Sequence, residues 1–242
     1  MNDDPLRVRT SVIGLVSFAA AEEQMLLAAA SQDGTGPGSP ARWAARPLVA
    51  HNTEFRAQQV QRLASIRDRR VPPQFAEIDH SSAEIYRRYC EQDAGAVAAA
   101  SRQTAQALVA GLGVTPDEDL FDPARNPWLN GRQLWLQIIV RGFWHPAGHL
   151  GDYYLAHGQA GRAVALHAQA VSLAGYLGAP DPARGMACYN LACAQARAGR
   201  PGDALGALRE AIARNPDLRA NAARDADLRS LRDAGRLGAL LG

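Results

Sequence analysis

Three histidines have the residue type and the spacing of a metal site. His145 and His149 are four residues apart in a predicted helix, so their side chains lie on one face of it. His51 lies in an earlier predicted helix, on the apolar face with Leu48 and Phe55, and should point inward. Two imidazoles from one helix and one from a facing helix can hold a metal and leave positions open for water or substrate. The alternative is a set of interior histidines satisfied by hydrogen bonds.

Several polar residues lie near these histidines in the predicted helices. Asp152, one turn beyond His149, can orient a metal-binding imidazole. Arg141, one turn before His145, can meet an anionic group of a ligand. It can equally pair with a carboxylate such as that of Glu54 or Asp152. The other candidates for a pocket around the site are Asn52, Gln58, Gln59 and Tyr153.

Other kinds of chemistry are excluded by what the sequence lacks. None of the 26 basic residues is a lysine, which removes Schiff-base and lysine-base catalysis. Cys90, Cys188 and Cys193 form no CxxC pair, and their odd number is typical of structural thiols in a reducing compartment. The sequence also has no phosphate-binding glycine loop, no GxSxG, no EF-hand spacing and no zinc-finger cysteine pattern.

The composition indicates a folded chain without a general attraction to polyanions. Hydrophobic residues make up 47% and charged residues 21% of the 242 residues, and the net charge is +2. The apolar run 12–21 is about ten residues long, too short to span a bilayer, and Asp3 and Asp4 precede it where a signal peptide is basic. We therefore expect a cytoplasmic protein with no nucleic-acid or membrane partner.

Four long helices joined by loops are expected in residues 1–158. No segment shows the sustained alternation of a strand, so the pattern predicts an all-α four-helix bundle. Pro146 lies between His145 and His149 and should kink the last helix. Ser81 and Glu84 form a capping-box pattern at the start of the third helix. The expected helices are 11–31, 47–67, 81–112 and 129–157.

Residues 159–242 have the pattern of tetratricopeptide repeats. The segment from Gly185 to Pro216 reads as the helical hairpin of one repeat of about 34 residues. Residues 161–178 resemble the second helix of a preceding repeat, and DADLRSLRDAGRLGALL resembles a polar capping helix. Because each repeat buries its face only on a neighbour, we expect this region to dock on the last bundle helix. The predicted packing positions are Leu191, Ala192, Ala204, Leu208 and Ala211.

The segments around the histidines resemble a known superfamily. LVAHNTEFRAQQVQRL and GRQLWLQIIVRGFWHPAGHLGDYYLAHG resemble helices of the DinB/YfiT-like superfamily, with the closest likeness to its ClbS/DfsB-type branch. The likeness covers residues 12–157. It implies a DinB-like four-helix bundle whose metal ligands are one histidine of the second helix and an HxxxH pair, here His51, His145 and His149. Nitrogen ligands of this kind suit zinc, nickel or iron.

The resemblance implies a metal-dependent hydrolase or thiol transferase that detoxifies a small electrophile. In the ClbS/DfsB-type branch it implies self-resistance to a DNA-damaging natural product through opening of a strained ring. The metal would lower the pKa of a bound water or thiol. The alternative function is a non-catalytic module that binds a ligand in the bundle core, or a peptide on the tetratricopeptide-like helices. Because related bundles pair through flat helix faces, we also expect a homodimer.

Overall fold

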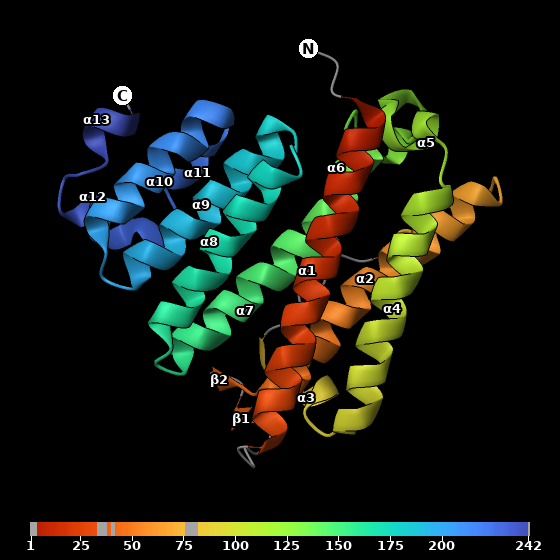
Figure 1. Cartoon of the computed structure of the whole chain (residues 1–242), viewed down its shortest axis with the longest axis horizontal. Helices are drawn as coiled ribbons and strands as arrows, with labels where there is room; N and C mark the ends of the chain where they lie inside the picture. Colours follow the sequence, from red (N-terminus) through yellow and green to blue (C-terminus); the bar gives the residue numbers. More distant parts are fainter. Residues whose placement is uncertain (1–3, 33–37, 40–41, 76–81, 242) are drawn as a thin grey trace. The chain divides into compact units, whose positions relative to one another are not determined.

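A computed structural model describes residues 4–32, 38–39, 42–75 and 82–241 (Figure 1). The described part is all-α, as predicted, apart from one antiparallel pair of two-residue strands. The elements are α1 (Pro5–Gln32), β1 (Gly38–Ser39), β2 (Arg42–Trp43), α2 (Ala45–Arg67), α3 (Ser82–Tyr89), α4 (Ala94–Val114), α5 (Asp117–Phe121), η1 (Pro123–Arg125), η2 (Pro127–Leu129), α6 (Leu134–Ile139), η3 (Val140–Trp144), α7 (His145–Ala156), α8 (Ala160–Tyr176), α9 (Asp181–Arg197), α10 (Pro201–Arg214), α11 (Leu218–Ala222), η4 (Ala226–Leu228), α12 (Arg229–Asp233) and α13 (Gly238–Leu241). Of the η elements, η3 is a π-helical turn and the others are 3-10 turns.

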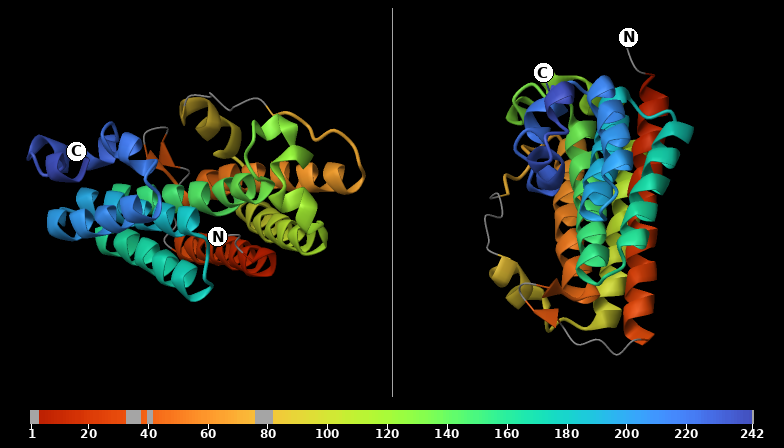
Figure 2. Two further views of the ribbon diagram at one scale, coloured as in Figure 1. Left: turned by 90° about the horizontal axis from the view of Figure 1, so that it is seen from above. Right: turned by 90° about the vertical axis from the view of Figure 1, so that its left-hand side faces the viewer.

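The chain divides into two compact units, residues 4–153 and 154–242. The division falls inside α7, near the boundary expected after residue 158. In the first unit α1, α2, α4 and the α6–η3 segment pack against one another (Figures 1 and 2). This packing brings α2 beside η3, and so brings the helix of His51 beside the segment that leads into His145. The fully buried apolar side chains of the first unit include Val12, Val16, Leu108, Leu112, Leu134 and Ile138.

A fully buried ion pair ties three of these helices together. Arg56 of α2 makes a bidentate contact with Glu23 of α1, with Nη1 donating to Oε1 at 2.8 Å and Nη2 donating to Oε2. Ser101 of α4 donates to the same carboxylate at 3.0 Å. Asn52 of α2 donates to it at 3.0 Å as well. Because a buried carboxylate is tolerated only when its charge and lone pairs are matched, this network fixes α1, α2 and α4 in register.

Among the described residues, α1 is also the one helix that is long and apolar enough to cross a membrane by length and composition. The candidate span is Pro5–Ala30, and 44% of its most apolar window is buried within the structure. The helix begins earlier than expected, at Pro5 rather than at residue 11. Its contacts with α2, α4 and α6, together with the buried Glu23, give it the role of a core helix in this unit.

The prediction of a single third helix is wrong. The structure has two helices, α3 and α4, separated by residues 90–93. Asp93 begins the second one, because its side chain accepts a hydrogen bond from the N–H of Ala96 at 2.8 Å and so caps the new N-terminus. The expected cap at Ser81 lies outside the described residues.

The fourth predicted helix begins later than expected. Asn130 and Gly131 have positive φ angles of 53° and 80°, which a right-handed helix does not allow. The helix therefore starts at Leu134 instead of at residue 129. The residues before it form the short 3-10 turns η1 and η2.

The kink expected at Pro146 takes the form of the π turn η3. There the N–H of His145 donates to the carbonyl of Val140, five residues back. Pro146 follows directly; it has no N–H, and its ring would clash with a carbonyl four residues back, so the wider turn absorbs both defects. Gly142 lies inside the turn, where a Cβ would come within 3.0 Å of Cγ2 of Val16. A glycine is thus required for α1 to approach this segment.

In the second unit α9 and α10 form a helical hairpin, and α9 also packs on α8. The turn between the two helices contains Gly199 with a φ of 72°. Gly185 of α9 has no room for a side chain, because a Cβ there would lie 2.8 Å from Cβ of Asn215 and 3.1 Å from the carbonyl oxygen of Ala211. Of the predicted packing positions, Leu191 is half-buried; the fully buried ones are Ala192, Ala204, Leu208 and Ala211.

The prediction of one capping helix after residue 224 is wrong. The segment contains three short elements, η4, α12 and α13. Asp225 caps η4 by accepting a hydrogen bond from the N–H of Asp227 at 2.9 Å. Gly235, with a φ of 67°, then separates α12 from α13. Local capping and turn residues thus divide a segment whose composition alone resembles a helix.

Candidate metal centre

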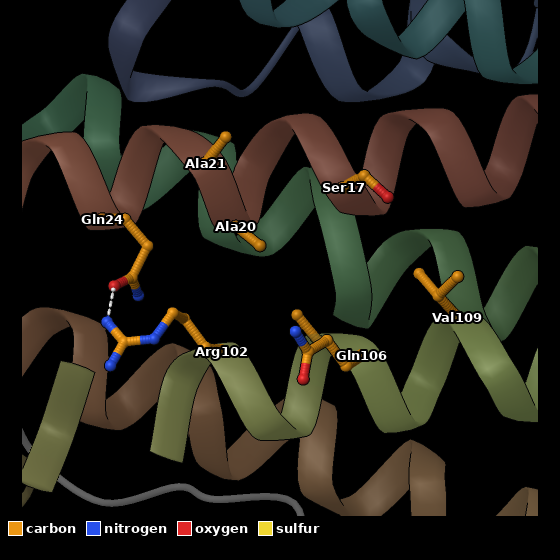
Figure 3. A pocket seen from close by; sticks show the side chains of 8 residues that line it. Ser17, Ala20, Ala21, Gln24, Arg102, Gln106 and Val109 are labelled. Atoms are coloured by element: carbon orange, nitrogen blue, oxygen red, sulfur yellow. Dashed lines mark hydrogen bonds between the residues drawn. The ribbon is translucent and has the colours of Figure 1, made fainter. Parts of the chain in front are cut away.

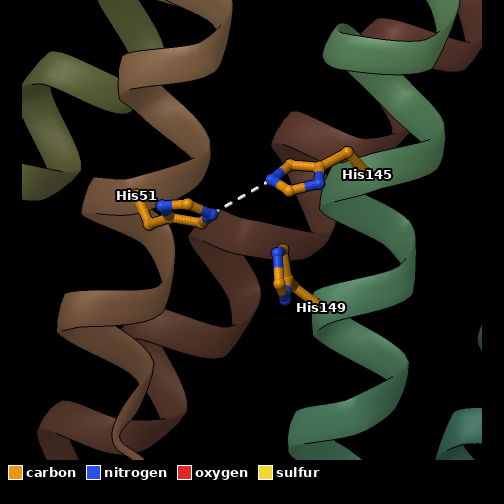
Figure 4. A group of neighbouring side chains, drawn as sticks. All are labelled: His51, His145 and His149. Carbon is orange, nitrogen blue, oxygen red and sulfur yellow. Dashed lines mark hydrogen bonds between the residues drawn. The ribbon is translucent and has the colours of Figure 1, made fainter. Parts of the chain in front are cut away.

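The side chains of His51, His145 and His149 lie together between α2 and α7 (Figure 4). Nε2 of His51 and Nε2 of His145 are 3.0 Å apart. One ring nitrogen from each of the three histidines lies within 4.8 Å of the others. Since metal–nitrogen bonds are about 2 Å long, small ring rotations would bring all three nitrogens to one ion.

Two nitrogens of this cluster have no hydrogen-bond partner in the described part of the chain. They are Nδ1 of His51 and Nε2 of His149, and both are buried. Leaving a buried polar atom unpaired costs about 1–3 kcal/mol. Histidines kept only for packing would be expected to have both nitrogens satisfied. Nε2 of His149 therefore fits a donor that awaits a ligand, whereas Nδ1 of His51 lies on the other side of its ring from the Nε2 atom that faces His145.

The environment keeps these imidazoles neutral. Burial, reinforced by His149 and then Arg141, lowers the pKa of His51 to about 3. Burial and the same neighbours, together with His51, lower the pKa of His145 to about 2. Burial also lowers the pKa of His149, and the negative charges of Asp152 and Glu23 oppose that shift. Neutral imidazoles are the protonation state that a metal requires.

Three aromatic side chains surround the histidines. Trp43 of β2 stacks on His149, with ring centres 6.3 Å apart and planes 12° apart. The ring centres of Phe55 and His145 are 4.4 Å apart, and those of Tyr89 of α3 and His51 are 6.4 Å apart. Trp43 and Tyr89 were not predicted at the site, because neither belongs to the predicted helices that carry the histidines. Apolar walls of this kind lower the local dielectric and strengthen electrostatic interactions inside the site.

Arg141 lies next to the cluster, and Gln58 lies farther along the same face of α2. The guanidinium of Arg141 lies 4.8 Å over the ring of Phe55, which itself contacts His51 and His145. Gln58 is two turns along α2 from His51 and is 9% exposed. Glu54, one of the carboxylates considered for Arg141, forms an ion pair of 3.4 Å with Arg88.

The remaining predicted residues have different positions. Asn52 belongs to the buried network of Glu23, where it supports α2 from behind the histidines. Asp152 is exposed on α7 and acts on His149 through its charge, which raises the pKa of that imidazole. Tyr153 is half-buried at the end of the first unit. Gln59 is fully buried and accepts a hydrogen bond from Arg62 at 3.2 Å.

The other histidines lie apart from this cluster. His157 follows the end of α7 and is half-buried, and His167 is buried in α8. His80 lies outside the described residues. Neither His157 nor His167 belongs to a group with metal-binding geometry.

A second group with the spacing of metal ligands lies in the other unit. It contains Cys193, Asp225 and Asp227, whose ligand atoms lie within 4.8 Å of one another. Here each group has a protein partner. Oδ2 of Asp225 accepts hydrogen bonds from Tyr189 at 2.7 Å and from Cys193 at 3.8 Å, and Asp227 pairs with Arg197 at 3.5 Å. Burial and the two carboxylates raise the pKa of Cys193, so the thiol stays protonated and the group holds the loop after α11 in place.

A shallow groove between α1 and α4 offers little chemistry. Its walls are mostly alanine and other small side chains (Figure 3). The one charged residue there, Arg102, donates to Gln24 at 2.7 Å. The lining of the groove has no histidine or carboxylate that could activate the hydroxyl of Ser17, so the histidine cluster is the stronger candidate site.

Comparison with known proteins gives no match, either to a family model, to a curated protein or to a solved structure. The site is therefore defined by its geometry. It consists of three imidazoles from two helices that burial keeps neutral, with buried nitrogens that have no partner among the described residues and with aromatic walls.

Proposed function

We propose that this protein is a metal-dependent enzyme in which His51, His145 and His149 bind one divalent transition metal. The observation that carries the proposal is the convergence of three neutral imidazoles, together with the buried Nε2 of His149, which has no hydrogen-bond partner among the described residues. Nitrogen donors suit zinc, nickel or iron. Three protein ligands leave at least one position for an exogenous group, which is the ligand number of catalytic rather than structural sites.

A metal held there supplies a Lewis acid that lowers the pKa of a bound water or thiol. The protein groups around it have separate roles. Trp43, Phe55 and Tyr89 exclude water and limit access to small ligands. The charge of Asp152 makes His149 a more basic ligand, because it raises the pKa of the imidazole that burial lowers.

The reaction that we propose is nucleophilic opening of a strained ring in a small electrophile, as the resemblance to DinB-like bundles of the ClbS/DfsB type suggests. The oxygen or sulfur of the nucleophile bonds to a ring carbon, the carbon–heteroatom bond of the ring breaks, and the proton of the nucleophile ends on the released heteroatom. The chain would thereby protect its cell from a reactive natural product. The proposal includes both a hydrolase and a thiol transferase.

The test is turnover of a small epoxide by metal-loaded protein, with and without an added thiol. We expect ring opening by the wild type and its loss in His149→Ala. Stimulation by the thiol would identify a transferase, and turnover without thiol would identify a hydrolase. Stoichiometric metal binding without any ring opening under either condition would contradict the proposed reaction.

A further inference from the structure

Arg62 of α2 is a buried cation that has no anion beside it among the described residues. It is 7% exposed, and none of the described carboxylates pairs with it. Nη1 donates to Oε1 of Gln59 at 3.2 Å, whereas the buried Nε has no hydrogen-bond partner in the described part of the chain. Burying a guanidinium whose charge is unmatched costs stability. A residue retained for folding alone would not be expected to carry this cost.

Arg56, six residues earlier on the same helix, shows the contrast. It is fully buried, and its Nε also has no partner among the described residues, but its charge is matched by the bidentate contact with Glu23. Arg62 has instead two aromatic neighbours, with its guanidinium carbon 5.0 Å from the ring centre of Phe75 and 5.1 Å from that of Trp128. These contacts hold a cation in place without neutralising it.

A second cation reinforces the positive charge of this region. Arg141 of η3 faces α2, and its charge acts on Arg62: burial, and after it the charge of Arg141, lowers the pKa of Arg62. An anion bound beside Arg62 would be attracted by both charges, because charges in a partly buried region are weakly screened.

These cations adjoin the histidine cluster. His51, Phe55, Gln58 and Arg62 lie at helical intervals along one face of α2, and all four are buried. The ring of Phe55 contacts His51 and His145, and the guanidinium of Arg141 lies 4.8 Å over the same ring. The amide of Gln58, one turn before Arg62, makes no hydrogen bond to a described residue. Donors therefore continue along the helix from the point where the imidazoles end.

We propose that Arg62, Arg141 and Gln58 form an anion-binding subsite that holds a carboxylate or phosphate group of the molecule acted on at the histidines. The guanidinium groups supply charge and a forked set of N–H donors that matches such oxygens, and the amide supplies a further donor. The assignment to a substrate rests on the proposed function, whereas anion binding does not require the metal. With this subsite, the preferred substrate is an electrophile that carries an acidic group.

The experiment measures the melting temperature of metal-free full-length protein in phosphate, acetate or chloride at equal ionic strength. We expect phosphate or acetate to raise the melting temperature of the wild type relative to chloride, since a ligand stabilises the state that binds it. Arg62→Met should lose this response. In chloride it should melt about 2–4 °C higher than the wild type, because an unmatched buried charge is replaced by an apolar side chain of similar length.

Arg56→Met is the matched control. It removes a buried arginine from the same helix but leaves Glu23 unpaired, so it should melt lower than the wild type and keep the anion response. The relative sizes of the phosphate and acetate shifts identify which acidic group the subsite prefers. A wild type that responds to neither anion, or an Arg62→Met variant that melts lower and still responds, would overturn the proposal.

His149→Ala separates this inference from the proposed function. It should lose metal binding and keep the anion response, because His149 is not part of the subsite. If the wild type binds no metal but responds to the anions, the metal proposal fails and the subsite stands. If it binds metal but no anion, the subsite fails alone.

Discussion

The Nε2 atoms of His51 and His145 lie 3.0 Å apart, although 94 residues separate them in the sequence. At this distance one ring must donate a proton and the other must accept it, so the two imidazoles cannot both be cationic. The same two nitrogen atoms are those that an ion would use, once the donor ring has moved its proton to its Nδ1 atom. Metal binding would therefore replace one hydrogen bond by two stronger contacts and add His149 as a third ligand.

Removal of one imidazole should abolish tight metal binding. His149→Ala, stripped with a chelator and titrated with Zn²⁺, should bind more than about 100-fold more weakly than the wild type. Loss of an outer contact alone typically costs 10–100-fold, and this change removes a ligand. Helical content should stay nearly unchanged, because alanine favours helices. His157→Ala is the control and should bind one ion per chain like the wild type; equal affinities of all three proteins would exclude the site.

The metal-free protein should lose stability as the pH falls below about 6.5. The unfolded chain then takes up protons on His51 and His145, whose folded-state pKa values are about 3 and 2, so protonation favours unfolding. Each such histidine steepens the dependence of the free energy of unfolding on pH by up to about 1.4 kcal/mol per pH unit. Urea denaturation between pH 7 and pH 4.5 measures this pH dependence. His145→Gln should reduce the slope, and an identical slope in both proteins would show that this imidazole is not kept neutral.

Breaking the buried ion pair should be among the most destabilising single changes. Glu23→Gln leaves the charge of Arg56 unmatched in the core and should lower the free energy of unfolding by about 3–5 kcal/mol. The double variant Glu23→Leu/Arg56→Met should recover much of that loss, because no charge then remains buried. Denaturant titration of the wild type and these two variants measures the loss and the recovery of the free energy of unfolding. Asp68→Asn, in an exposed ion pair, should behave like the wild type.

Replacing either of two glycines in the second unit by alanine should change its stability, in opposite directions for the two positions. Gly185→Ala puts a Cβ 2.8 Å from Asn215 and should destabilise the hairpin by about 1–3 kcal/mol. Gly206→Ala lies in the middle of α10 with no atom within 4 Å and should stabilise it by up to about 1 kcal/mol. Thermal unfolding of the two variants and the wild type measures both effects. Similar effects would contradict the close approach of α9 and α10.

The hydroxyl of Tyr189 should hold the loop after α11. Tyr189→Phe removes its hydrogen bond to Asp225 and should cost about 1.5–3 kcal/mol, because a bond to a carboxylate is lost. Tyr176→Phe is the matched control, since Tyr176 is 89% exposed. If the group around Cys193 held a metal instead, Cys193→Ser would lower the metal content per chain; we expect it to leave that content unchanged.

The sequence by itself determined the helical class and the identity of the three histidines. Helical periodicity is a local property, and the spacing of His145 and His149 fixes their common face once a helix forms. Capping and turn residues are local as well, but Asp93 and Gly235 lie inside segments whose composition favours continuous helices. The breaks after α3 and after α12 were therefore missed.

Only the tertiary structure decided what lies around the histidines. Trp43, Phe55 and Tyr89 come from three separate elements, and their meeting at the cluster depends on how α2 packs beside η3. The same packing distinguishes two arginines of one helix. Arg56 faces a carboxylate of α1 and Arg62 faces the charge of Arg141, a difference that neither residue type nor spacing contains. Periodicity assigns a side chain to a face, whereas the charge that it meets there comes from a distant part of the chain.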